Sequence, residues 1–147
     1  MADLIVARFP QGARIVVGVG TGTTLAGLAA ALPARFSIEG VVALRGDGQL
    51  ESTIAGWVSD MAAETHAGWR LHRDFHCGGF ARTNARLRAL MRHCDRELGL
   101  ELEPVYTGKA LLALHSLLAG GTWSAREPII LVHSGGLQGR RGYPWLD

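Results

Sequence analysis

A strand-to-helix transition rich in glycine and threonine constrains the fold of this chain most strongly. Residues 16–32 read VVGVGTGTTLAGLAAAL: a β-branched run, then glycines at every second position, then good helix formers. The first N–H groups of a helix lack partners within it, and the helix dipole favours negative charge there. A glycine turn leaves these donors uncovered, and the hydroxyls of Thr21, Thr23 and Thr24 add to them. The pattern predicts a site for a compact phosphate group; the alternative is that the glycines only let strand and helix pack closely.

The glycines do not fit the two common nucleotide-binding patterns. The G-x-G-x-x-G pattern fails from Gly18, because position 23 is threonine, and from Gly20, because position 25 is leucine. The Walker pattern fails because Gly27 is followed by leucine and alanine instead of lysine and a hydroxyl residue. A nucleotide-binding α/β domain, with Arg45 contacting a ribose phosphate, remains an alternative.

Apolar runs and helical patterns alternate along the chain. The expected strands are near-continuous β-branched runs, typical of parallel strands covered on both faces: Arg14–Val19, Ile38–Leu44 and Pro128–His133. The expected helices show apolar periodicity or good helix formers: Thr24–Leu32, Leu50 to near Gly68, a stretch capped by Thr83 that ends at Gly99, and about Gly108 to Leu118. This order predicts one α/β domain with a mainly parallel sheet flanked by helices.

Composition narrows the possible functions. The 147 residues are 48% hydrophobic and 19% charged, which suits one domain with its own core. The net charge of +2 is too small, and the arginines too scattered, to indicate a nucleic-acid partner. No apolar run approaches the roughly 20 residues of a membrane span and no leader is evident, so we expect no membrane association and a cytoplasmic location.

The cysteines and histidines do not indicate a metal site. Cys77 and Cys94 form neither a CxxC motif nor a disulfide framework, so both are expected to be unpaired thiols. His72, His76 and His93, taken with Cys77, lack a standard zinc spacing. Asp47 lies beside two glycines and is interpreted as a turn residue.

Four motifs occur in a fixed order and carry a family resemblance. They are GTGTTLAG at 20–27, HCGGFARTNARL at 76–87, EPVYTGKALLAL at 103–114 and LVHSGGLQG at 131–139. Together they resemble the C-terminal portion of the D-cysteine desulfhydrase and 1-aminocyclopropane-1-carboxylate deaminase family. Those proteins are pyridoxal-phosphate enzymes with the tryptophan-synthase-β-like fold. The resemblance implies that residues 1–147 are part of the large domain of a fold type II enzyme, a fragment without the N-terminal segment and most of the small domain.

The resemblance also implies roles for particular residues. The residues matching the family's phosphate loop are Gly20, Thr21, Gly22, Thr23 and Thr24. Tyr106 and Thr107 match residues beside the cofactor ring and the substrate, Tyr106 as a catalytic residue and Thr107 as a cofactor-binding one. Ser134 and Gly135 match a site whose hydroxyl faces the pyridine nitrogen.

Three departures from the family pattern modify these expectations. Family deaminases have glutamate at the position of Thr107, which favours the desulfhydrase-like branch. Phe80 stands where family members usually have tyrosine. The lysine that holds the cofactor as a Schiff base lies in the family's N-terminal segment, and this chain has one lysine, Lys109. We expect Lys109 to be a lysine near a helix start and not the Schiff-base residue.

The sequence therefore predicts a pyridoxal-phosphate-dependent lyase or deaminase that acts on a small amino acid. D-Cysteine, giving pyruvate and ammonia, is the expected substrate, and the isolated chain is expected to be inactive. A separate N-terminal half or a homodimer partner could supply what these residues lack. The alternative is a non-catalytic, truncated module that holds only the cofactor phosphate.

Overall fold

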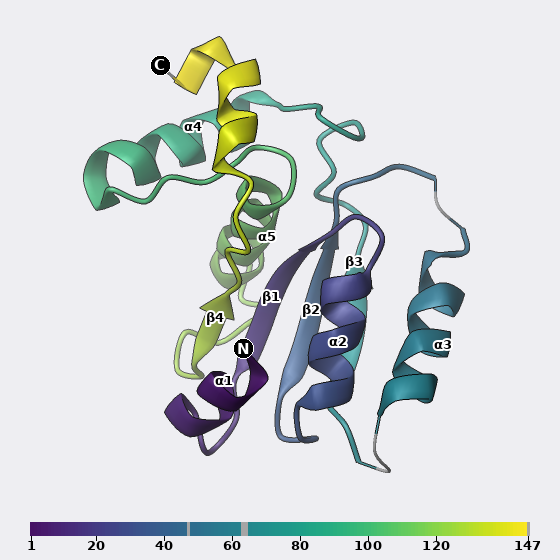
Figure 1. The fold of residues 1–147 in the computed structure, drawn as a ribbon. Coiled ribbons are helices and arrows are strands. Elements are labelled where there is room, and N and C mark those ends of the chain that lie inside the picture. Colours follow the sequence, from purple (N-terminus) through teal and green to yellow (C-terminus); the bar gives the residue numbers. More distant parts are fainter. Residues whose placement is uncertain (47, 63–64, 147) are drawn as a thin grey trace.

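The computed structural model describes residues 1–46, 48–62 and 65–146, so Asp47 lies outside the described residues (Figure 1). Its centre is a four-stranded, all-parallel sheet with strand order β3-β2-β1-β4. The strands are β1 (Arg14–Val19), β2 (Ser37–Val42), β3 (Gly68–His72) and β4 (Ile129–Leu131). The predicted class, an α/β fold with a parallel sheet flanked by helices, is confirmed.

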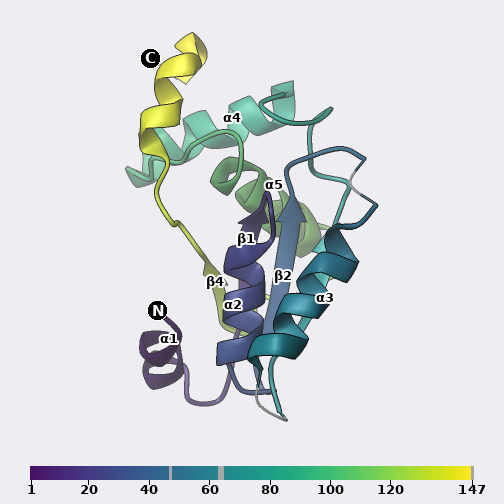
Figure 2. The same ribbon diagram turned by 45° about the vertical axis from the view of Figure 1, so that its right-hand side comes forward.

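Helices cover both faces of this sheet (Figures 1 and 2). On one face lie α1 (Ala2–Arg8), α2 (Thr23–Ala31) and α3 (Leu50–Met61), and α5 (Thr107–Ala119) packs on the other. The helix α4 (Ala85–His93) continues as a π-helical turn, η1 (Cys94–Leu98), and packs on α5. The chain ends in two short 3-10 helices, η2 (Leu137–Gly142) and η3 (Pro144–Leu146). No helix among the described residues is long and apolar enough to cross a membrane.

Alternation along β1 divides the core into two layers. Ile15, Val17 and Val19 pack in the cluster under α2 and α3, whereas Val16 packs with Ala110 of α5 on the other face. β1 pairs with β2 and β4 at its two edges, and helices cover both of its faces, so its side chains pack in both layers. The continuous apolar run that predicted this strand is the sequence signature of that position.

Three sequence predictions about elements are wrong. The stretch 128–133, expected to be a strand covered on both faces, forms only the three-residue β4, which is half-buried at the edge of the sheet. The helix that begins at Leu50 ends at Met61, and Gly68 starts the edge strand β3. The alternating pattern of β3, with Trp69 and Leu71 turned to the core, is only five residues long and escaped notice. The cap of α4 is Asn84, whose Oδ1 accepts a hydrogen bond from the Leu87 N–H at 2.9 Å.

A paired group of charges lies beside the sheet on the α5 face. Glu39 of β2 is 1% exposed, yet its carboxylate contacts Arg14 Nη1 and lies 2.7 Å from His72 Nε2. Arg14 also donates to Glu127, and its guanidinium lies 5.0 Å from the ring centroid of Trp123. Burial raises the pKa of Glu39, but the hydrogen bond with His72 and the positive charge of Arg14 outweigh it, so the pKa lies below its ordinary value of 4.5.

Candidate functional site

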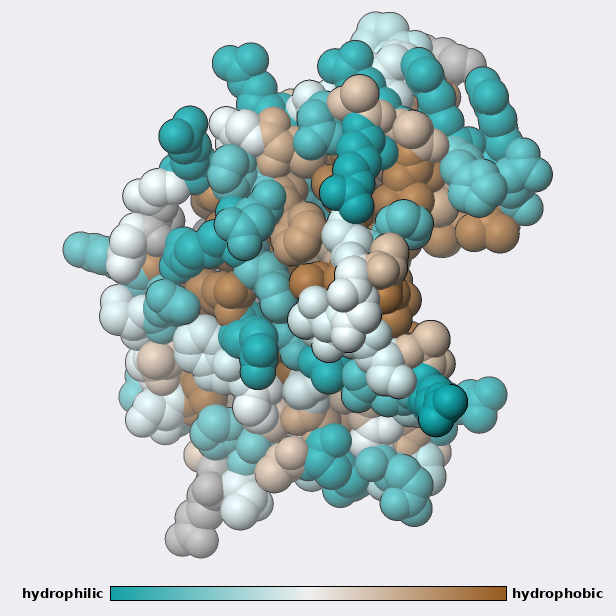
Figure 3. Space-filling view, turned by 180° about the vertical axis from the view of Figure 1, so that it is seen from behind, coloured by the Kyte–Doolittle hydropathy of each residue, from teal (hydrophilic) through white to brown (hydrophobic). Residues whose placement is uncertain are grey.

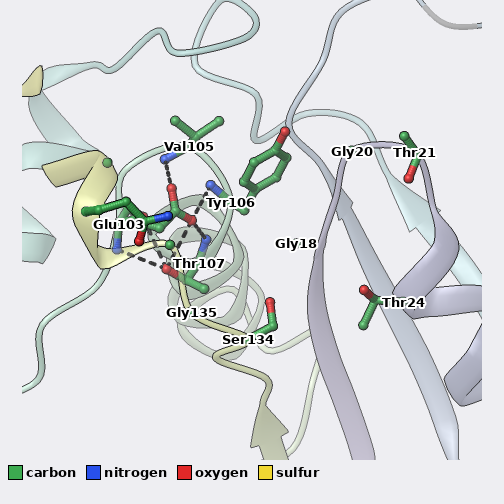
Figure 4. Close-up of a pocket in the computed structure, with 13 residues that line it drawn as sticks. Gly18, Gly20, Thr21, Thr24, Glu103, Val105, Tyr106, Thr107, Ser134 and Gly135 are labelled. Atoms are coloured by element: carbon green, nitrogen blue, oxygen red, sulfur yellow. Dashed lines mark hydrogen bonds between the residues drawn. The ribbon is translucent and has the colours of Figure 1, made fainter.

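A pocket of about 490 Å³ lies at the carboxyl end of the sheet, the edge at which open α/β sheets bind ligands (Figure 4). Three segments that are distant in sequence form its wall: the turn after β1, the segment leading into α5, and the segment after β4. The lining residues are Gly18, Gly20, Thr21, Thr24, Glu103, Val105, Tyr106, Thr107, Ser134, Gly135, Gly136, Gln138 and Gly139.

The turn from β1 to α2 has the predicted geometry. β1 ends at Val19, α2 begins at Thr23, and Gly22 caps the helix in a left-handed conformation with φ of 91°. A Cβ at Gly22 would lie 2.5 Å from the side chain of Ile54, so both conformation and space require glycine. No side chain caps this helix start within the described part of the chain, so its N–H groups remain available to a ligand.

The alternating glycines also make room for Tyr106. A Cβ at Gly18 would lie 2.8 Å from Tyr106 Cβ, and a Cβ at Gly20 would lie 3.1 Å from Tyr106 Oη. The phenol therefore lies across the end of β1, with its hydroxyl beside the glycine turn (Figure 4). Sequence reasoning assigned these glycines to an anion site or to close packing of strand and helix, and missed their close contact with Tyr106.

Glu103 is a pocket residue that sequence reasoning missed. Its buried carboxylate accepts hydrogen bonds from the N–H groups of Val105 and Tyr106, both at 2.7 Å, and from the N–H of Thr107 (Figure 4). An acidic side chain a few residues before a helix is a capping signal that could have identified it. Glu103 thus satisfies the first N–H groups at the start of α5 and fixes the backbone that carries Tyr106.

The starts of α5 and α2 both lie at this pocket, and they differ in the charge that they present to a ligand. The N-terminus of α5 is occupied by a negative charge of the protein itself, through Glu103. The N-terminus of α2 has no such group and is flanked by the hydroxyls of Thr21 and Thr24. A negatively charged ligand is therefore repelled from α5 and attracted to α2.

Most residues predicted from the sequence line this pocket. They are Gly20, Thr21, Thr24, Tyr106, Thr107, Ser134 and Gly135. Gly22 turns toward Ile54 instead, and the Thr23 hydroxyl lies 3.0 Å from that of Thr21 and outside the lining. Their binding and catalytic roles stay predictions.

Thr107 reaches the pocket with its hydroxyl already engaged. Thr107 Oγ1 accepts a hydrogen bond from the Glu103 N–H at 3.1 Å and lies 3.2 Å from a Glu103 carboxylate oxygen. The residue is 3% exposed. Its hydroxyl therefore serves the helix start more directly than it could serve a ligand.

Lys109, the third residue of α5, is fully buried and outside the pocket lining. Its Nζ donates to the carbonyl oxygens of Gly79 at 2.8 Å and Ala43 at 3.1 Å. Burial lowers the pKa of this amine, while the nearby Cys77 and Glu103 oppose that shift. The amine thus ties the loop after β2 to the loop around Gly79.

Phe80 and the cysteines lie around the site. Phe80 is 57% exposed, and its ring centroid lies 6.3 Å from that of Tyr106, so the aromatic position is kept without a hydroxyl. Cys77 and Cys94 are both free thiols. Among the described residues, no group of three or more histidine, cysteine or acidic side chains could hold a metal ion.

The fold and the pocket define a class of protein: a parallel α/β domain that presents an uncapped, glycine-rich helix start to a small-molecule pocket. Comparison with known proteins narrows this class. The chain is 28% identical over 137 residues to a Pyrococcus furiosus protein named "Putative 1-aminocyclopropane-1-carboxylate deaminase". That match covers 88% of this chain and 41% of the relative.

A solved structure gives the same result. A crystal structure described as an ACC (1-aminocyclopropane-1-carboxylate) deaminase homologue matches with a TM-score of 0.75 and 26% sequence identity. The match covers 90% of this chain and 43% of the matched chain. No protein-family model matches the chain. The resemblance predicted from the four motifs is confirmed by both relatives, and the chain spans less than half the length of each.

Proposed function

We propose that this chain forms the phosphate-binding and ring-binding part of a pyridoxal-phosphate-dependent lyase or deaminase that acts on a small amino acid. The observation that carries the proposal is the contrast between the two helix starts at the pocket. Glu103 occupies the start of α5, so the uncapped start of α2 is the place for a phosphate. Similarity to relatives named as deaminases points to the same cofactor class.

The residues present fit this group in size and chemistry. A volume of about 490 Å³ lies within the range of small-molecule sites. The N–H groups at the α2 start, with the hydroxyls of Thr21 and Thr24, are donors suited to a phosphate dianion. Glycines at 18 and 20 keep side chains out of the space beside the Tyr106 ring. When bound, pyridoxal phosphate supplies an electron sink for negative charge that develops at the substrate Cα.

Ser134 and Tyr106 are the side chains proposed to contact the ring and the substrate. Ser134 follows β4 and presents a neutral hydroxyl, which would leave a pyridine nitrogen less protonated than a carboxylate partner would. The phenol of Tyr106 lies between the glycine turn and the open pocket, where it can position a substrate or hold a proton for a leaving group.

D-Cysteine is the substrate we propose, with pyruvate and ammonia as products. The choice depends on position 107, where the resemblance gives glutamate in ring-opening deaminases. Here the position holds Thr107, whose hydroxyl is bound to Glu103. Glu103 itself accepts three backbone N–H groups, so neither residue offers a free acid to the substrate.

The covalent step needs an amine that these residues do not provide. Lys109 Nζ is bound to two carbonyl oxygens inside the protein and does not line the pocket. We therefore propose that the lysine comes from polypeptide outside these 147 residues, either a separate N-terminal half or a partner subunit. The isolated chain is then a cofactor-phosphate-binding module without turnover.

The test combines binding, labelling and turnover of the purified chain. We expect pyridoxal phosphate to quench protein fluorescence reversibly, and pyridoxal without phosphate to bind at least roughly tenfold more weakly, because charge-assisted contacts are lost. After borohydride reduction, mass spectrometry should find no labelled lysine, and D-cysteine should give no pyruvate. Equal binding of the two compounds would contradict the phosphate site. Label on Lys109 with pyruvate release would contradict the proposed source of the lysine.

A further inference from the structure

Lys109 is unusual among the basic residues of the chain. It is the only lysine among fifteen lysine and arginine residues, and it is 0% exposed. The arginines of α4, in contrast, are exposed, and Figure 3 shows hydrophilic side chains projecting into solvent at the end of the molecule that carries α4. Burial of a charged amine costs folding free energy unless hydrogen bonds compensate for the lost water. The partners of this amine therefore indicate what it does.

The two partners of the Lys109 amine are backbone carbonyl oxygens from separate parts of the chain. Ala43 directly follows β2, and Gly79 lies in the loop between β3 and α4. A lysine side chain suits this position because it is long and unbranched, and its ammonium group donates up to three hydrogen bonds and accepts none. From α5, the amine thus fastens the loop at Gly79 to the end of the sheet.

The loop around Gly79 has an unfavourable backbone conformation. Cys77 and Ala81, with φ of 57° and 55°, are the only non-glycine residues with positive φ in the described part of the chain. A side chain in this left-handed region is sterically disfavoured, so such residues persist where neighbouring contacts hold the backbone. Two contacts do so here. The Lys109 amine donates to the Gly79 carbonyl at 2.8 Å, and the Tyr143 hydroxyl donates to the Ala81 carbonyl at 3.0 Å.

Phe80 lies between these two fixed carbonyls. Its side chain is largely exposed, yet its ring centroid lies 6.3 Å from that of Tyr106, with 58° between the ring planes. Tilted aromatic pairs at this separation attract each other. Tyr106 also lies close to the glycine turn, where a Cβ at Gly20 would lie 3.1 Å from the phenol oxygen. The phenol therefore has the glycine turn and the ring of Phe80 as neighbours.

From these contacts we infer that Lys109 is a positioning residue for Tyr106. Its amine fixes the Gly79 carbonyl, and the fixed loop presents the Phe80 ring to the Tyr106 phenol. The ring restricts where the phenol lies in the pocket. The inference rests on the proposed function in one respect, that Tyr106 contacts the ring of the bound cofactor. A side chain that is ordered before binding raises affinity, because less conformational freedom is lost when the ligand enters.

The first experiment measures the contact between the two rings in the ligand-free chain. Lys109→Met keeps a long apolar side chain and removes the donors, so the nuclear Overhauser effect between the Phe80 and Tyr106 rings should be lost. Val58→Ala in α3 is the control, because Val58 is buried on the other face of the sheet and its truncation lowers stability without involving the loop. The control should keep the Overhauser effect. Its survival in Lys109→Met would overturn the inference, whether or not the chain binds a cofactor.

The second experiment separates the cofactor ring from its phosphate. Inorganic phosphate and pyridoxal phosphate are titrated into the native chain, into Lys109→Met and into Phe80→Ala, an exposed substitution that should fold. Both variants should bind pyridoxal phosphate about three- to tenfold more weakly, the value of one side chain that must be ordered on binding. Both should bind inorganic phosphate as the native chain does. The double variant should bind pyridoxal phosphate no more weakly than Phe80→Ala, because Lys109 acts through Phe80.

The outcomes distinguish this inference from the proposed function. If the native chain binds neither compound, the proposed function fails, while the ring contact still tests Lys109. Equal losses for both compounds in Lys109→Met, or additive losses in the double variant, would mean that Lys109 supports general stability and does not act through Phe80. If Lys109→Met does not fold, Phe80→Ala decides: weaker binding of pyridoxal phosphate alone supports the inference, and unchanged binding contradicts it.

Discussion

Beside β3, the buried carboxylate of Glu39 is paired with Arg14 and His72, whereas at the carboxyl end of the sheet the start of α2 faces a pocket with no side-chain cap. Both regions are polar and both are built on the strands of one sheet. In the first, each carboxylate oxygen already has a partner within the protein. In the second, the helix start has no side-chain cap among the described residues, and Gly20, Thr21 and Thr24 line a pocket. Unsatisfied polar groups, and not polarity alone, separate a binding site from a stabilising charge network.

Glu103 lies in the pocket, but its carboxylate, like that of Glu39, already has hydrogen-bond partners within the protein. It is 5% exposed, and its carboxylate is filled by three backbone N–H groups. The pocket is therefore a mixture of satisfied groups that hold its shape and free groups that can meet a ligand. Substitutions at the two kinds of residue should therefore have different effects on stability and on binding.

Removal of Glu39 should have the largest effect on stability. Glu39→Ala leaves Arg14 and His72 without their buried partner, and such a loss costs about 3 kcal/mol or more of unfolding free energy. Affinity for pyridoxal phosphate should not change. Urea denaturation measures the stability loss, with Glu51→Ala as the control, since its contact with Arg73 is 3.5 Å long and largely exposed, and such pairs contribute about 1 kcal/mol or less.

Removal of Glu103 should affect both stability and binding. Glu103→Ala uncaps α5 and costs about 1–2 kcal/mol, and it also frees the backbone that positions Tyr106 at the pocket. Pyridoxal-phosphate affinity should fall along with the midpoint of urea unfolding. Glu103→Gln, which keeps the shape and an acceptor oxygen, should recover part of both. A variant that loses stability but binds normally would show that Glu103 plays no part in shaping the site.

Acid should weaken the charge network in a defined range. The folded-state pKa of Glu39 lies below 4.5, so its stabilisation is complete above about pH 4.5 and declines as the pH falls through the folded-state pKa. Stability measured from pH 7 to pH 3 should drop below about pH 4.5 in the native chain. Glu39→Gln should drop less across the same range. An equal loss of stability in both proteins across this pH range would show that Glu39 does not cause the acid sensitivity.

Loss of one hydroxyl at the α2 start should give the smallest effect. Thr24→Val removes a donor at the pocket and should lower affinity for pyridoxal phosphate by roughly three- to tenfold, the value of one hydrogen bond, with little change in stability. Thr53→Val, on the exposed surface of α3, is the matched control and should bind normally. Isothermal titration of both variants gives the comparison, and equal affinities would exclude Thr24 from the site.

Sequence patterns predicted the start of α2 and its pocket better than the charge network around Glu39. The β1–α2 transition was predicted to within about a residue, because a buried strand, a glycine turn and a helix each leave strong local signals. Strand β3 was missed because five alternating residues give little periodicity, and with it the partnership of His72 with Glu39 was missed. That contact joins residues 33 positions apart and depends on strand order, which local patterns do not contain. The role of Gly18 and Gly20 in admitting Tyr106 was hidden for the same reason.

The central claim is that the free donors at the α2 start, and not the satisfied charges beside β3, receive the phosphate of the cofactor. Amide chemical-shift perturbation during titration with pyridoxal phosphate tests it most directly. The account predicts the largest shifts at Gly20–Thr24, smaller shifts around Ser134, and none at Arg14, Glu39 or His72. Shifts concentrated at the Arg14–Glu39 end of the sheet, or no shift at Gly20–Thr24 under saturating ligand, would contradict it.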